Sequence, residues 1–283
     1  MSPSEAQALQ ALAIVFLTNT LVLTYLILRS KWHGLRLAGV VFLMYFGVYS
    51  FLSTIEALAF NTALEIQPNL LWFTLVAALM LTLVFAPLSV WWLGKRRPTT
   101  GPLPSDNIGA GLTKKEMAIK LLVLAALVYP ALYISFGYFV AWQNPDVRLL
   151  YTGSTEILPF WTQAWNAFTN PAWFYPFQIG RAFVWIGLAW LVMRSTKAGW
   201  VETGFIVGLN FALLMNAQHL LPNPFMSESI RLSHFLETAG SNFIWGFVIV
   251  WVLHRPHHSL ADLFNRDAHK RHRHRGHPVN VPV

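Results

Sequence analysis

The sequence predicts an all-α membrane protein, a bundle of seven transmembrane helices with the N-terminus outside and the C-terminus in the cytoplasm. Of the 283 residues, 55% are hydrophobic and only 11% are charged, against about 25% charged in soluble domains. A soluble core of this length could not bury so much apolar surface, so lipid has to be the solvent for most of it. The 15% of aromatic residues suits a protein with aromatic belts at two membrane interfaces.

Seven apolar segments reach the length of about 20 residues that a helix needs to cross a bilayer. They are residues 9–28, 37–60, 70–93, 117–142, 174–193, 200–221 and 230–253. Together they predict one transmembrane domain, residues 1–253, followed by a tail of residues 254–283. The first residues, MSPSEAQ, lack the basic stretch and cleavage site of a signal peptide, so the first segment is expected to be a retained span.

The distribution of basic residues predicts the orientation. With the N-terminus outside, all but three of the 20 Lys and Arg residues fall on the cytoplasmic side, the exceptions being Arg148, Arg181 and Arg231. Cytoplasmic loops of membrane proteins carry such an excess. Because the charges lie in short runs between apolar segments and in the tail, the net charge of +8 indicates orientation in a lipid bilayer and no nucleic acid partner. We expect a bacterial-type cytoplasmic membrane.

The predicted extracytoplasmic loop, residues 143–173, is aromatic. Trp161, Trp165 and Phe168 recur at helical spacing, which predicts a helix lying in the membrane interface. Such a helix could cover the bundle as a lid, or it could anchor the chain in the aromatic belt with no further role.

The tail contains seven of the ten histidines, interleaved with arginines. One interpretation is metal capture by a His-rich tract. The other is a disordered basic arm that contacts the anionic headgroups of the inner leaflet. The tail has few apolar residues around which a fold could form, which favours the arm.

Four predicted spans place their most polar residues in the same outer third of the bundle. Ionisable groups inside a membrane are expensive and point to function or to internal pairing, so these polar stripes should face one another. The candidate residues for substrate binding or proton relay are Glu56, Gln178, Arg181, His219, Arg231, His234, Glu237, Ser241 and Asn242.

Arg181 dominates the electrostatics of this set. A buried guanidinium remains charged and needs an anionic partner. Glu56 and Glu237 are the carboxylates at similar depth, so we predict that Arg181 pairs with at least one of them. The other carboxylate, beside His234 or His219, would suit a proton relay or general acid–base chemistry. The alternative is a Glu–Arg–Glu network that only fixes helix register.

A metal site is a further hypothesis for the same residues. His234 and Glu237 are three residues apart, and His219 and Glu56 could complete a site for zinc, iron or manganese. Ligation of a haem by His219 and His234 is another arrangement. The sequence contains no dense metal motif such as HExxH, and the absence of cysteine excludes thiolate ligands, disulfides and a cysteine nucleophile. The sequence identifies no cofactor.

Three classes of function therefore compete. The first is a protein that binds or transports a small solute or ion through the polar outer pocket, with proton coupling. The second is a membrane-embedded enzyme that uses His and Glu in acid–base or metal chemistry. The third is a structural or assembly subunit of a membrane complex. The first requires no motif that the sequence lacks.

Overall fold

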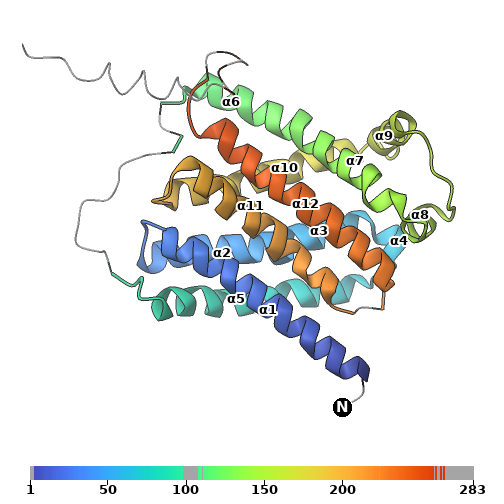
Figure 1. Cartoon of the computed structure of the whole chain (residues 1–283), viewed down its shortest axis with the longest axis horizontal. Coiled ribbons are helices and arrows are strands. Elements are labelled where there is room, and N and C mark those ends of the chain that lie inside the picture. The colour runs from blue at the N-terminus through green and yellow to red at the C-terminus, as the bar shows by residue number, and fades with distance from the viewer. Residues whose placement is uncertain are drawn as a thin grey trace, which may run out of the picture.

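A computed structural model describes residues 3–97, 108–109, 111–222, 224–257, 259, 262 and 264 of the chain. These residues form helices and connecting turns, without β-strands (Figure 1). Most of the predicted basic arm, residues 254–283, lies outside the described residues. The helices are α1 (Pro3–Arg29), α2 (Gly34–Met44), η1 (Tyr45–Phe51), α3 (Leu52–Ala59), α4 (Asn61–Leu64), α5 (Pro68–Trp92), α6 (Lys114–Val123), η2 (Leu124–Val128), α7 (Tyr129–Phe139), η3 (Ala141–Gln143), α8 (Pro145–Thr152), α9 (Phe160–Thr169), α10 (Phe174–Ser195), α11 (Trp200–Asn216), η4 (Ala217–Leu220) and α12 (Glu228–Leu253).

Seven of the helical stretches are long and apolar enough to cross a membrane, which confirms the predicted class of protein. Three of them join shorter helices end to end: α2, η1 and α3; α6, η2, α7 and η3; and α11 and η4. They lie within a few residues of the predicted spans. The orientation with the N-terminus outside stays a prediction.

The bundle has two chemically different ends. At one end, on the left of Figure 1, lie the turns of residues 29–34, 94–97 and 195–199; we call this the basic end. At the other, on the right, lie α4, α8 and α9; we call this the aromatic end. The helix predicted in the aromatic loop is present as α9, and its Trp161 and Trp165 side chains are 80% and 70% exposed. Side chains that point away from the bundle favour the anchor over the lid.

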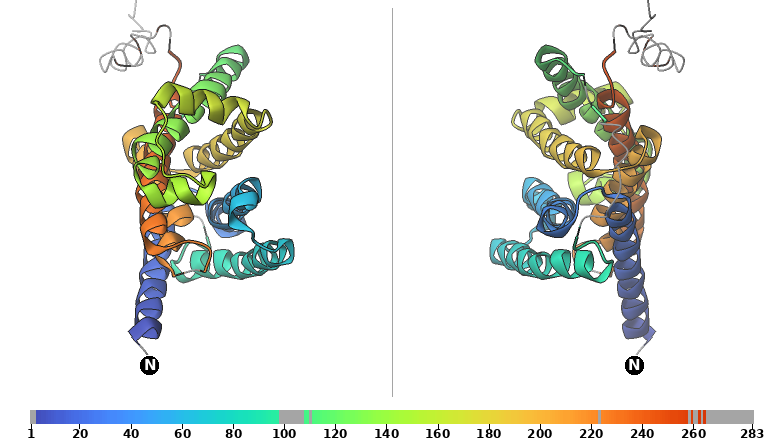
Figure 2. Two further views of the ribbon diagram at one scale, coloured as in Figure 1. Left: turned by 90° about the vertical axis from the view of Figure 1, so that its right-hand side faces the viewer. Right: turned by 90° about the vertical axis from the view of Figure 1, so that its left-hand side faces the viewer.

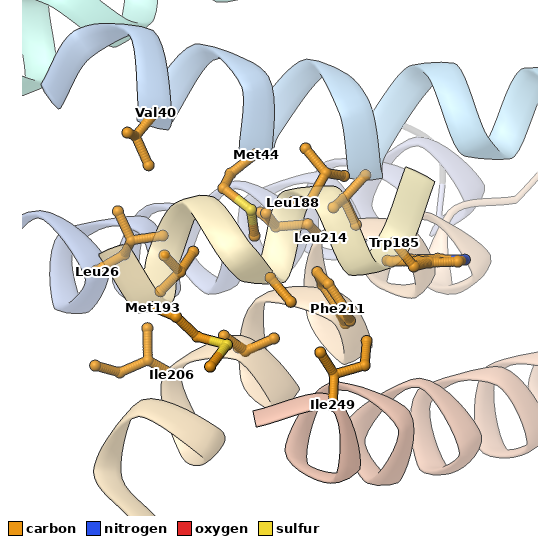
Figure 3. Close-up of a cluster of buried hydrophobic side chains, with 14 of the residues drawn as sticks. Leu26, Val40, Met44, Trp185, Leu188, Met193, Ile206, Phe211, Leu214 and Ile249 are labelled. Atoms are coloured by element: carbon orange, nitrogen blue, oxygen red, sulfur yellow. The ribbon is translucent and has the colours of Figure 1, made fainter. Parts of the chain in front are cut away.

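The apolar core lies between α1, α2, α10, α11 and α12, nearer the basic end. Figure 3 shows Trp185, Phe211 and Ile249 meeting there from three different helices. Trp185 and Phe211 are tilted against each other with ring centroids 4.4 Å apart. This packing closes the bundle on the basic-end side of the polar residues described below.

The α5 helix is the most peripheral of the seven. It packs against α2 and η1 and lies on the opposite side of the bundle from α7 (Figure 2). Only 17% of its most apolar window is buried, and Trp72, Phe73 and Met80 are more than half exposed. Exposed apolar area of this extent requires lipid or a partner protein to cover it.

The end of α12 is held against the start of α6 by an uncharged histidine. Lys120 Nζ donates to His257 Nδ1 over 2.8 Å, and the His257 backbone N–H donates to Glu116 Oε1 over 2.8 Å. The pKa of His257 is lowered to about 4, first by burial and then by the nearby Lys120 and Arg255, with Asp262 and Glu116 opposing them. The imidazole is therefore neutral at physiological pH.

We expect acid to release this contact. The folded pKa of about 4 is lower than the ordinary value of 6.5, so the contact stabilises the fold above pH 6.5 and is lost as the pH falls from there towards 4. Hydrogen exchange at the His257 amide, corrected for the intrinsic effect of pH, should accelerate over this range. In His257→Gln, whose side chain does not titrate, protection should stay constant; equal acceleration in both proteins would contradict the prediction.

Candidate functional site

Predicted site residues from three helices line one small cavity. Glu56 comes from α3, Arg181 from α10, and Glu237, Ser241 and Asn242 from α12. The water-accessible volume of the cavity is about 20 Å³, which is enough for about one water molecule. The other lining residues are Tyr129, Leu132, Tyr133, Met215, Thr238 and Trp245.

Arg181 and Glu56 form a buried two-point ion pair, as predicted. Arg181 Nη1 and Nη2 donate to the two carboxylate oxygens of Glu56 over 3.0 and 2.9 Å. The Arg181 side chain is 2% exposed and that of Glu56 is 22% exposed. Gln178, one turn earlier on α10, accepts a third hydrogen bond from Arg181 Nη1 over 3.1 Å. The pair ties α10 to α3 and neutralises one of the two carboxylates that line the cavity.

The second carboxylate, Glu237, is paired with a histidine. His234 Nδ1 lies 2.9 Å from Glu237 Oε2, one turn along α12. The other ring nitrogen, Nε2, lies 3.2 Å from the Tyr151 hydroxyl of α8. A phenol, an imidazole and a carboxylate thus form one hydrogen-bonded chain. It runs from α8 at the aromatic end to the wall of the cavity.

Tyr151 was not predicted as a site residue. It belongs to the loop that the sequence identified only as an aromatic belt, and its position depends on how α8 folds back over α12. It packs against Phe60, with ring centroids 5.6 Å apart, and stacks on Trp142 at 6.0 Å. Burial raises the pKa of Tyr151, and the nearby Glu237 and Glu56 raise it further, so it remains a protonated hydrogen-bond donor.

Two irregular helical turns shape the cavity. The π-helical turn η1 precedes Glu56, and η2 precedes Tyr129 and Tyr133. Pro130 lacks the N–H that would bond the Ala126 carbonyl, and Tyr175 from α10 donates its hydroxyl to this carbonyl instead over 2.5 Å. Such π-turns occur often at functional sites. Only Pro130 signals an irregularity in the sequence, so the lining tyrosines were missed.

The cavity contains buried hydrogen-bond donors without a partner. Arg181 Nε and Trp245 Nε1 make no hydrogen bond within the described part of the chain. A water molecule in the cavity could accept from one of them and donate to a carboxylate. Such a water would link the Arg181–Glu56 and Glu237–His234 pairs.

The other predicted residues make contacts in or beside this cavity. His219 lies beside His234, with ring centroids 6.1 Å apart. Arg231 donates to the carbonyls of His219 and Leu221 over 2.9 and 2.7 Å, so it joins α12 to the end of η4. The amide of Asn242 contacts Met215 Sδ over 3.6 Å. The Ser241 hydroxyl donates to the Thr238 carbonyl over 3.3 Å.

The geometry does not favour the metal hypotheses. Within the described ranges, no three His, Asp or Glu side chains lie close enough together to hold a metal ion. Both nitrogens of His234 already have partners, which leaves neither free to ligate a metal or a haem alongside His219.

Comparison of the chain with protein-family models, with curated proteins and with solved structures finds no match. Within the described residues, the chain has seven helices long and apolar enough to cross a membrane, and the carboxylates of Glu56 and Glu237 line one cavity.

Proposed function

We propose that this protein is an integral protein of a bacterial-type cytoplasmic membrane that binds a small ion, with proton linkage, at the cavity between α3, α7, α10 and α12. The observation that carries the proposal is the pairing of the two carboxylates. Glu56 is neutralised by a guanidinium that remains charged, whereas Glu237 is hydrogen-bonded to the imidazole of His234. We therefore place the proton linkage at the Glu237–His234 pair.

The size of the cavity limits which ligands can bind. A volume of about 20 Å³ accommodates a water molecule or a single ion of similar size. A larger solute would require the helices to move apart. The hydroxyls of Ser241 and Thr238 and the carboxylates supply oxygen atoms, which suit a small monovalent cation in competition with a proton.

Transport of the bound ion across the membrane is a more specific version of this proposal. The Tyr151–His234–Glu237 chain provides a route for protons from the aromatic end, which we place outside. On the basic-end side, the site is followed by the apolar side chains of Trp185, Phe211 and Ile249. A complete pathway would therefore need a second conformation in which this packing opens.

The binding proposal is tested with the purified protein and defined ions. The melting temperature is measured while the concentration of Li⁺, Na⁺, K⁺ or chloride is raised, each at several pH values. We expect one monovalent cation to stabilise the protein, by about 2.7 kcal/mol at 100 times its Kd. Its apparent affinity should weaken about tenfold for each pH unit of acidification wherever a proton competes for the site.

Glu237→Gln should abolish both the ion response and its pH dependence. Glu156→Gln is the matched control, because it removes the same charge from an exposed position at the same end of the bundle. If no ion changes the melting temperature at any pH, or if both variants respond as the parent does, the site is a structural network and the proposal fails.

A further inference from the structure

The basic end of the bundle carries a dense and fixed cluster of cations. Eight Lys and Arg residues lie in the three segments 29–36, 94–97 and 194–202, with Glu202 as the one carboxylate in these segments. Glu202 is already bound by Arg29 over 2.5 Å and by the Tyr25 hydroxyl over 3.1 Å. The cluster therefore has a large positive excess that these segments do not neutralise.

Backbone hydrogen bonds hold the three segments together. Lys31 N–H donates to the Ser195 carbonyl over 2.7 Å, and Lys197 N–H donates to the Arg29 carbonyl over 2.9 Å. Lys95 Nζ donates to the Ser30 carbonyl over 2.9 Å. The turns cannot separate to relieve the repulsion between their charges without breaking these bonds. The arrangement is thus preorganised to receive negative charge.

The electrostatics of the lysines agree with this geometry. Burial lowers the pKa of Lys31, and the nearby Arg194 and Arg36 lower it further. Burial also lowers the pKa of Lys95, with a contribution from Lys197. Charges from all three segments therefore act on one another, and an anion placed between them would relieve the repulsion.

Each of the three segments pairs an arginine with a tryptophan. The guanidinium carbon of Arg36 lies 3.6 Å from the ring centroid of Trp32, and that of Arg96 lies 4.2 Å from the centroid of Trp91. Arg194 lies 6.0 Å from the centroid of Trp190. Tryptophan and arginine together are typical of the headgroup level of a bilayer.

Exposed apolar side chains adjoin the cations. Leu35, next to Arg36, is 86% exposed, and Trp92, three residues before Lys95, is 81% exposed. A free phosphate ion would contact only the cations. A phospholipid would contact the cations through its headgroup and the exposed apolar side chains through its acyl chains. We propose that the segments 29–36, 94–97 and 194–199 form a binding site for the phosphate headgroup of an anionic phospholipid. This site is separate from the carboxylate cavity.

The test is native mass spectrometry of the detergent-purified full chain with phosphatidylglycerol and with phosphatidylcholine of the same acyl chains. We expect phosphatidylglycerol to bind more tightly, and Arg194→Gln/Lys197→Gln to weaken it by about fivefold for each charge removed. Lys114→Gln/Lys115→Gln is the control, because these residues are also exposed near the basic end but lie outside the three segments. It should leave the affinity unchanged.

Two other outcomes would overturn the proposal. Equal weakening in both double variants, or equal affinity for the two lipids, would mean that attraction to the basic end is diffuse. Displacement of phosphatidylglycerol by an equal concentration of inorganic phosphate would mean that the site recognises the free ion. Arg36→Gln, tested in parallel, should also weaken binding about fivefold; it separates an effect on the site from local misfolding of the 194–199 turn.

Discussion

Replacing Arg181 with methionine is expected to destabilise the protein by about 3–5 kcal/mol, because it leaves the Glu56 carboxylate without its partner in the apolar bundle. Both carboxylate oxygens of Glu56 are bound by Arg181 at present. Methionine retains much of the length of the side chain, so loss of charge pairing outweighs loss of packing. The measurement is the free energy of unfolding in a fixed detergent, compared with the parent chain.

The double variant Glu56→Gln/Arg181→Met is the informative control. Removing both charges from a buried pair is often close to neutral, so most of the lost stability should return. If Arg181→Met alone costs less than about 1 kcal/mol, the pair behaves as an exposed one and the burial argument is wrong.

The same double variant separates structure from function. If it folds well and keeps the response to ions, the Arg181–Glu56 pair only positions helices α3 and α10. If it folds well and loses that response, the pair belongs to the binding site. Stability and binding thus report on different roles of the same two side chains.

The sequence allowed the depth of each polar group in the membrane to be predicted, but not which neighbouring helix the group faces. Arg181, Glu56 and Glu237 fall at similar depth because topology and helical rise determine depth. The choice of Glu56 as the partner of Arg181 depends on which helices are neighbours, and apolar segments of similar composition do not encode that order. The His234–Glu237 contact was predictable because both residues lie on one helix, three positions apart.

Tyr151 and the lining tyrosines show the other limit of prediction. The position of Tyr151 depends on the path of a long loop, and the loop composition is equally typical of an interfacial anchor. Tyr129 and Tyr133 follow the π-helical turn η2, which rotates the rest of the helix relative to a regular α-helix. A periodicity of 3.6 residues carried across that turn therefore misplaces these tyrosines around the helix.

The size of the cavity favours a single small ion over an organic solute as the ligand. A site for an organic solute is commonly several hundred Å³ in volume, whereas this cavity has room for about one water molecule. The two carboxylates are closely spaced, and each is already paired with Arg181 or His234. We therefore expect the site to respond to protons and single ions in this conformation, and to accept a larger molecule only by opening.

Substituting Gly246 with alanine is expected to destabilise the protein by about 1–3 kcal/mol through overpacking between α11 and α12. A Cβ atom at Gly246 would lie 2.9 Å from both the Cα and the N atoms of Gly208. These are backbone atoms, so no side-chain rotation can relieve the clash and the two helices have to separate. The measurement is again the free energy of unfolding, together with the ion response of the folded protein.

Gly187→Ala on α10 is the matched control, because a Cβ atom there would meet nothing within 4 Å. Alanine favours a helix over glycine by about 1 kcal/mol, so this variant should be neutral or more stable. Gly246 lies on the helix that carries His234 and Glu237, and separation of α12 from α11 would widen the cavity beside Met215. Unchanged stability in Gly246→Ala would show that α11 and α12 are not in backbone contact at Gly208.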